Sequence, residues 1–189
     1  MSARFLWLDV RATLGERKTL LAAGLMAYAV LAVPFLVAKP PEHVMAAMGT
    51  LFGVSEPFTL FLYLWTDLAM NKLVVILGLV LAGGLVARER ETGVLAVLLS
   101  TPVSPARYYL VRALSACAVM GLLYVAGHLV AAPLVARSVP GFRAGTFFAS
   151  MAVHLFAAFF CVCFSALMSV LVPKRSLAAL VSLLVLFSL

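Results

Sequence analysis

Long intervals without a charged residue are the feature that most constrains this chain. A helix needs about 20 apolar residues to cross the roughly 30 Å hydrocarbon layer of a bilayer, because every backbone N–H and C=O must be paired within the segment. Residues 19–38, which lie between Lys18 and Lys39, form such an interval. The sequence therefore predicts an integral membrane protein that crosses the bilayer as α-helices.

Four further intervals have the same character, and we predict a membrane span in each of them: residues 66–87, 106–135, 145–172 and 176–189. The charge-free part of the second interval, 73–87, gives only about 22 Å of helix. We therefore extend this span back past Lys72, whose side chain can reach outward. The last run stops after about 21 Å. We expect an all-α helical bundle in one transmembrane domain over residues 1–189, with five spans here and a sixth in the full chain.

Composition excludes a soluble protein. Apolar residues make up 65% of the chain and charged residues 11%, against about 45–50% and a quarter in soluble domains. Too few polar side chains exist to cover a water-soluble globule of this size. The net charge of +7 comes from basic residues placed between apolar runs, which argues against a nucleic-acid surface.

The distribution of basic residues predicts the orientation. Lys and Arg stay preferentially in cytoplasmic loops, and a cytoplasmic N-terminus places ten of them inside and four outside. Residues 1–18 mix large apolar side chains with charges, as in a helix that lies in the headgroup plane. The alternative is an ordinary juxtamembrane stretch with Trp7 as its anchor.

The link between the second and third spans carries the most specific pattern. Residues 88–91 alternate in charge, residues 94–99 are apolar, and a Ser-Thr-Pro-Val-Ser-Pro stretch follows. The apolar block is too short to cross the membrane and too apolar to lie in water. We predict a short helix that lies against the inner membrane face or a partner protein and ends at Pro102. Ser104 and Pro105 then fit the N-cap and first position of the third span.

This link resembles the signature of type-2, exporter-like ATP-binding-cassette (ABC) permeases, which have six spans per subunit. The resemblance rests on Glu-Arg-Glu-x-Gly-x-Leu followed by Leu-Leu-Ser-x-Pro-Val-Ser. The chain looks most similar to single-domain bacterial permeases, including the one in nitrous-oxide-reductase maturation. The resemblance implies a multi-pass protein of the inner (plasma) membrane. It also implies that residues 1–18 form an interfacial elbow helix and that residues 89–104 form the coupling segment that rests on the ATPase.

By this resemblance, the chain is the permease subunit of a transporter that couples ATP hydrolysis to export of a substrate or to conformational work. The implied partners are ABC ATPase subunits, which bind ATP and Mg, a second permease copy in a homodimer or heterodimer, and the lipid bilayer. The predicted ATPase-coupling residues are Glu89, Arg90, Glu91, Gly93, Val94, Leu95, Leu98, Leu99 and Pro102. The charges would pair across the contact and the apolar residues would supply buried area. In the alternative interpretation, the charges only stop membrane transfer and the apolar block lies on lipid.

Motifs for enzyme chemistry do not occur in the sequence. There is no Gly-x-x-x-x-Gly-Lys-[Ser/Thr], so the chain cannot hold ATP by the P-loop route. His-Glu-x-x-His, Gly-x-Ser-x-Gly and Cys-x-x-Cys are also absent. We predict no catalytic residue and no cofactor in this chain.

Polar residues within apolar sequence give two weaker hypotheses. Asp67, Asn71 and Lys72 either line a translocation path or outer vestibule, or pair locally. A group of soft ligands, His43, Met45 and Met48, fits Cu(I) but also fits a packed amphipathic face.

Other residues fit packing between helices. His128 and His154 are expected to make interhelical hydrogen bonds, and small residues four apart, at Gly78 and Ala82 and at Ser165 and Ser169, permit close helix contacts.

Two other functions stay open. One is an ATP-driven mechanical coupler that acts on an extracytoplasmic partner protein, as in metalloenzyme maturation, without moving a bulk substrate; residues 44–58 would be its docking face. The other is a membrane-embedded lipid enzyme, for which the sequence shows no cluster of acid, base or metal-binding groups.

Overall fold

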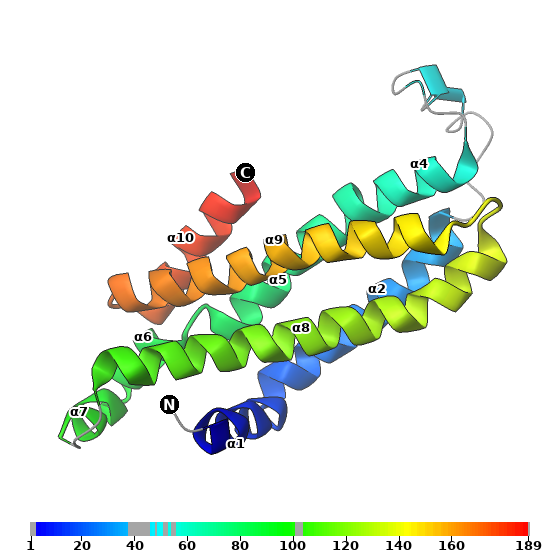
Figure 1. The fold of residues 1–189 in the computed structure, drawn as a ribbon. Coiled ribbons are helices and arrows are strands. Elements are labelled where there is room, and N and C mark those ends of the chain that lie inside the picture. The colour runs from blue at the N-terminus through cyan, green and yellow to red at the C-terminus, as the bar shows by residue number, and fades with distance from the viewer. Residues whose placement is uncertain are drawn as a thin grey trace.

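The structure is a computed structural model that describes residues 3–37, 46–47, 49–50, 53, 56–100 and 104–188. Every regular element in these residues is a helix, which confirms the predicted all-α class (Figure 1). The elements are α1 (Ala3–Leu14), α2 (Arg17–Val37), α4 (Pro57–Tyr63), the π-helix η1 (Leu64–Met70), α5 (Asn71–Ala82), α6 (Leu85–Glu91), α7 (Val94–Leu99), α8 (Pro105–Ser138), α9 (Ala144–Leu171) and α10 (Arg175–Ser188).

Four helical stretches are long and apolar enough to cross a membrane: Arg17–Pro34, Pro57–Glu91, Pro105–Ser138 and Ala144–Leu171. They overlap the first four predicted spans. The second begins at Pro57 rather than at residue 66, because the sequence before Trp65 is also apolar and Pro57 suits the first turn of a helix. The fifth predicted span corresponds to α10, a shorter apolar helix, so the count of five stays a prediction.

Small residues allow a close helix contact between α5 and α9. A Cβ atom added to Gly78 would lie 3.0 Å from the Cβ of Cys161 and 3.1 Å from its carbonyl carbon. Ser165 and Ser169, on the facing side of α9, are fully buried. The predicted role of these small residues in close packing is therefore confirmed within the bundle.

An aromatic cluster lies in the bundle between η1, α8 and α9. Trp65 of η1 and Phe147 of α9 pack around His128 of α8. The His128 Nδ1 bonds to the Tyr124 carbonyl (2.9 Å), and its Nε2 accepts from the Trp65 Nε1 (3.3 Å). The expected interhelical hydrogen bond is confirmed for His128, whereas His154 bonds to Ser150 of its own helix.

A break at Gly83 and Gly84 separates α5 from α6. Backbone groups freed by such a break must find other partners inside a membrane protein. The Ser169 hydroxyl oxygen accepts from the N–H groups of Val86 (2.9 Å) and Ala87 (3.1 Å). At the end of α5, the Leu81 carbonyl accepts from the Lys18 Nζ (3.2 Å). Side chains from α2 and α9 thus stabilise the break.

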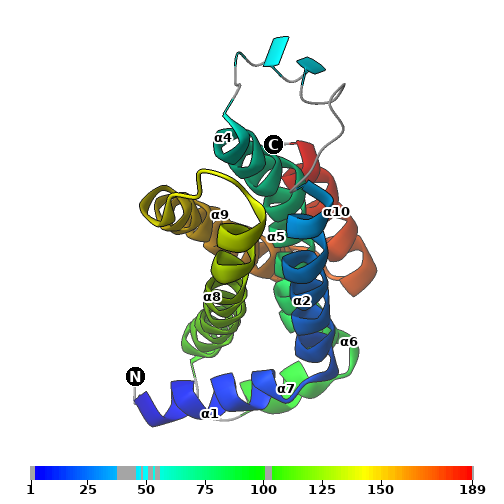
Figure 2. The ribbon, with the colours of Figure 1, turned by 90° about the vertical axis from the view of Figure 1, so that its right-hand side faces the viewer.

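Three of the shorter helices gather at one end of the bundle. Helix α1 lies across this end, where α6 and α7 also lie (Figure 2). Trp7 and Leu8 of α1 are 64% and 61% exposed, as expected for a helix whose apolar face meets the membrane. The α8 helix begins here, and the turn from α9 to α10 is at the same end (Figure 1).

Candidate functional site

The predicted coupling segment forms two short helices joined by a turn at Gly93. The φ angle of Gly93 is +74°, a left-handed conformation that costs a side-chain-bearing residue about 1 kcal/mol or more. Gly93 therefore permits the reversal from α6 to α7. In α7, Val94 and Val97 are 47% and 68% exposed. A short apolar helix thus projects from the end of the bundle.

Glu89 points back from α6 into an ion cluster with α1 and α8. Its Oε1 accepts from the Tyr108 hydroxyl (2.7 Å) and lies 3.6 Å from the Arg112 Nη2. The Arg112 Nη1 donates to the Oδ1 of Asp9 in α1 (3.0 Å). One guanidinium therefore links two carboxylates from elements that are far apart in the sequence.

This ion cluster of Asp9, Glu89, Tyr108 and Arg112 is shielded from solvent. The side chains of Asp9 and Arg112 are 18% exposed and that of Glu89 is 13% exposed. Within the described residues, the Asp9 Oδ2, Glu89 Oε2 and Arg112 Nε atoms are buried without a hydrogen-bond partner. Removal of one member of such a cluster leaves a partly buried charge without its partner, which costs more than loss of a surface pair.

Arg90 and Glu91 hold α6 to the turn between α9 and α10. The Arg90 Nη2 donates to the Val170 carbonyl (3.0 Å), at the end of α9. The Glu91 Oε1 accepts from the backbone N–H of Arg175 (2.8 Å), at the start of α10. Both bonds satisfy backbone groups at helix ends.

The structure thus places the three predicted coupling charges in contacts within this chain, a placement that the sequence did not predict. Their predicted pairing with an ATPase stays a prediction. Leu95 is half-buried in α7; the side chains of Leu98 and Leu99 and all of Pro102 lie outside the described residues. The sequence analysis also missed Val97, which is more exposed than Val94 and could have been found by its place in the apolar block.

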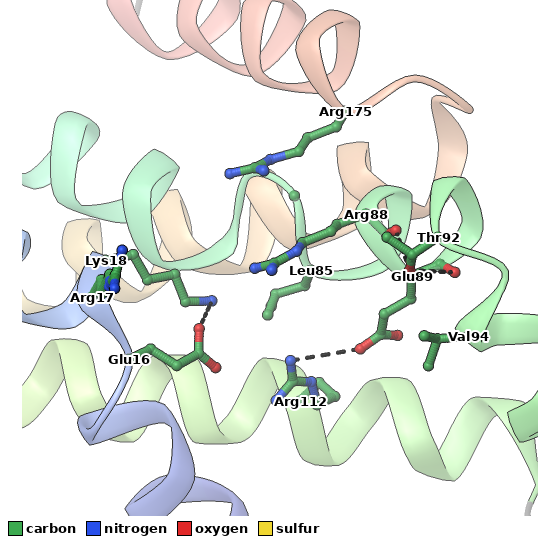
Figure 3. Close-up of a pocket in the computed structure, with 11 residues that line it drawn as sticks. Glu16, Arg17, Lys18, Leu85, Arg88, Glu89, Thr92, Val94, Arg112 and Arg175 are labelled. Carbon is green, nitrogen blue, oxygen red and sulfur yellow. Dashed lines mark hydrogen bonds and ion pairs between the residues drawn. The ribbon is translucent and has the colours of Figure 1, made fainter.

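A cavity of about 630 Å³ lies beside the ion cluster. The residues that line it are Glu16, Arg17, Lys18, Gly84, Leu85, Arg88, Glu89, Thr92, Val94, Arg112 and Arg175. In Figure 3, Lys18, Arg88 and Arg112 extend toward its centre from α2, α6 and α8. Basic side chains therefore dominate its walls.

The predicted polar group of the second span lies at another place on the bundle. Asp67, in the π-helix, is exposed, and so are Asn71 and Lys72 at the start of α5. The Lys72 Nζ lies 5.3 Å from the centre of the Phe187 ring of α10, a cation–π contact. The structure brings none of the three into the ion cluster.

The described residues contain no group of three or more His, Cys, Asp or Glu side chains that could hold a metal ion. The predicted ligands His43, Met45 and Met48 lie outside the described residues. Cys163 faces Cys117 of α8 with a Sγ–Sγ distance of 3.7 Å, whereas Cys161 is buried.

Comparison with known proteins decides the family. A family model with the description "ABC-2 family transporter protein" matches residues 15–189. The chain belongs to this family. A search of curated proteins gives no significant match.

Membership of the ABC-2 family makes this chain the membrane (permease) component of an ABC transporter. The ABC-2 membrane subunit has no catalytic activity of its own, and the family implies that the ATPase is a separate chain. The predicted permease function is confirmed, and α2, α8 and α9 are among the helices of this ABC-2 subunit that could cross the membrane.

Proposed function

We propose that this permease receives nucleotide-driven motion from its ATPase at α7 and passes it to the membrane helices through the ion cluster. The observation that carries the proposal is the bridge by Arg112 of α8 between Glu89 of α6 and Asp9 of α1. It joins the base of the projecting helix α7 to both an interfacial helix and a long membrane helix. A push on α7 would therefore displace α1 and α8 together.

In this proposal the bundle end with α1, α6 and α7 faces the cytoplasm, as the distribution of Lys and Arg predicts. Helix α7 docks on the ATPase through apolar contact, for which the exposure of Val94 and Val97 is the support. Glu89, Arg90 and Glu91 keep the docking helix fixed to the bundle, which is a revision of their predicted role as partners of ATPase charges.

A second copy of the permease is part of the proposal, in a homodimer or heterodimer that binds two ATPase subunits. Asp67, Asn71 and Lys72 are exposed on the subunit within a stretch apolar enough to span the membrane. Charged side chains that face lipid are costly. We infer that the partner copy covers this face and that the translocation path runs along it.

Export and mechanical work on an outer partner protein remain two forms of this function. The likeness to the permease of nitrous-oxide-reductase maturation and the five-span count stay predictions, and copper binding stays one of two interpretations of His43, Met45 and Met48. The docking face expected at residues 44–58 lies largely outside the described residues.

Photo-crosslinking tests where the ATPase docks. A photoreactive amino acid replaces Val97 in the permease, which is then co-purified with its ATPase. The control replaces Val153 of α9, which is also 68% exposed but belongs to a candidate membrane span. We expect a permease–ATPase crosslink from position 97 and none from position 153. Equal crosslinking from both positions, or none from 97 in an assembled complex, would refute the docking role of α7.

A further inference from the structure

We propose that the basic cavity between α2, α6, α8 and α10 binds an anionic phosphate group, as in the headgroup of an anionic phospholipid. The proposal goes beyond the coupling function and shares with it the assignment of this end to the cytoplasmic membrane surface. It rests on charge, on side chains without ion-pair partners and on the size of the cavity.

Charge is unbalanced in the cavity wall. Five side chains are cationic and two are carboxylates: Arg17, Lys18, Arg88, Arg112 and Arg175 against Glu16 and Glu89. Both carboxylates are already engaged. The Glu16 Oε2 lies 3.1 Å from the Lys18 Nζ, and the Glu89 Oε1 contacts Tyr108 and Arg112. The excess of positive charge is therefore left to attract an anion.

The excess of positive charge is carried by three arginines, Arg17, Arg88 and Arg175. In the part of the chain that the structure describes, none of the three forms an ion pair with a carboxylate. Arg88 and Arg175 come from α6 and from the start of α10, and both line the cavity (Figure 3). Guanidinium groups present paired N–H donors that match phosphate oxygens, so both arginines supply suitable donors to the wall of this cavity.

Gly84 allows Arg175 to lie along the cavity wall. A Cβ atom at position 84 would lie 2.8 Å from the Arg175 Nε and 2.9 Å from its Cγ. The break between α5 and α6 therefore leaves room for the arginine stem beside the backbone. The volume of about 630 Å³ falls within the roughly 300–1,000 Å³ of small-molecule sites, and is large enough for a headgroup rather than a single ion.

The position of the cavity favours a lipid over a dissolved anion. Lys18 stands at the start of the first candidate span, and Trp7 and Leu8 of α1, which lies across the same end of the bundle, are exposed. These features place the cavity at the depth of the headgroups in the proposed topology. A headgroup with net negative charge is preferred to a zwitterionic one, because the quaternary ammonium of the latter is repelled by the same arginines.

Native mass spectrometry of the purified protein in a maltoside detergent tests the proposal. Phosphatidylglycerol and phosphatidylcholine are titrated separately, without the ATPase. We expect phosphatidylglycerol to bind more tightly, and the double variant Arg88→Gln/Arg175→Gln to lose affinity by roughly tenfold or more. The matched control is Arg107→Gln/Lys174→Gln, which removes two exposed charges that do not line the cavity and should leave the preference in place.

Inorganic phosphate, added as a competitor, distinguishes a site for free phosphate from a site for a lipid headgroup. Displacement of phosphatidylglycerol by millimolar phosphate would support a site for free phosphate, and failure of phosphate to compete would support the lipid headgroup. Equal binding of the two lipids, or equal loss in the cavity and control variants, would overturn the proposal. If the double variant does not fold, Arg175→Gln alone is compared with Lys174→Gln, and no difference between these two also overturns it. Because the assay needs no ATPase, its outcome is separate from the crosslinking result for α7.

Discussion

At the seam between α5 and α9, small residues let two helices pack closely, whereas at the ion cluster charged side chains link α1, α6 and α8. Gly78 brings the α5 backbone against Cys161, and packing of this kind has one close-fitting arrangement. Arg112 holds Asp9 and Glu89 at 3.0 and 3.6 Å, so a few charged groups join three elements here. The difference indicates a rigid, close-packed seam and a joint held by a few charged groups in one subunit.

The largest expected effect comes from filling the seam. Gly78→Leu would force α5 and α9 apart, because even the first added carbon is within 3.1 Å of the α9 backbone. We expect a loss of roughly 3 kcal/mol, measured as a lower melting temperature in detergent. Gly24→Leu is the control, since a Cβ at Gly24 meets nothing within 4 Å. Similar melting temperatures for the two variants would show that the seam is not rigid.

A smaller loss is expected when the ion cluster is unbalanced. Arg112→Gln leaves Asp9 and Glu89 as two partly buried carboxylates without a cation, at a cost of about 2 kcal/mol. The neutral triple variant Asp9→Asn/Glu89→Gln/Arg112→Gln should regain most of this stability, since no unpaired charge remains. Chemical denaturation of the two variants measures the difference. A triple variant as unstable as Arg112→Gln would mean that the charges themselves hold the fold.

The fold could be predicted from the sequence more fully than the ion cluster. Charge-free intervals predicted four helices that the structure shows to be long and apolar enough to cross, because the bilayer imposes one length on every span. The spacing of small residues four apart also found Gly78 and Ser169. It could not pair Asp9 with Arg112, which are 103 positions apart, since no local pattern in one sequence records such a contact.

The contacts of residues 89–91 were also not predicted from the sequence, although these residues are neighbours in the chain. Their alternation in charge predicted contacts with another protein, but a helix sends neighbouring side chains in different directions. Glu89 turns toward α8, while Arg90 and Glu91 reach the turn between α9 and α10. The partner of each side chain depends on which helix lies near it, and the tertiary fold decides that arrangement.

Ser169 sharpens the comparison because it links the seam to the start of α6, the helix that carries Glu89 of the ion cluster. It is part of the small-residue face of α9, and its hydroxyl oxygen also accepts from Val86 and Ala87 at the start of α6. Ser169→Ala keeps the close packing but leaves two buried N–H groups unpaired, and we expect a loss of about 1.5 kcal/mol. Ser182→Ala is the control: that serine is equally buried, but it only donates to Ala178 of its own helix. Equal melting temperatures for the two variants would contradict the role of Ser169.

The smallest expected effect on stability is at Gly93. Gly93→Ala places a side chain at a φ angle of +74°, which costs about 1 kcal/mol and shifts α7 relative to α6. Hydrogen exchange by mass spectrometry should show faster exchange in residues 89–97 and unchanged exchange in α5 and α9. Gly145→Ala, where a Cβ meets nothing within 4 Å, should change neither. Faster exchange throughout the bundle in Gly93→Ala would show that residues 89–97 are not separate from the seam between α5 and α9.

The ATPase activity of the reconstituted complex tests the central claim most directly. The measurement compares wild-type permease with the triple variant Asp9→Asn/Glu89→Gln/Arg112→Gln, each assembled with its ATPase in vesicles. We predict that the variant assembles normally but loses most of the change in ATPase rate that the wild-type permease causes, because motion of α7 no longer reaches α1 and α8. A variant that assembles and changes the ATPase rate as the wild type does would contradict the claim that the ion cluster transmits the motion.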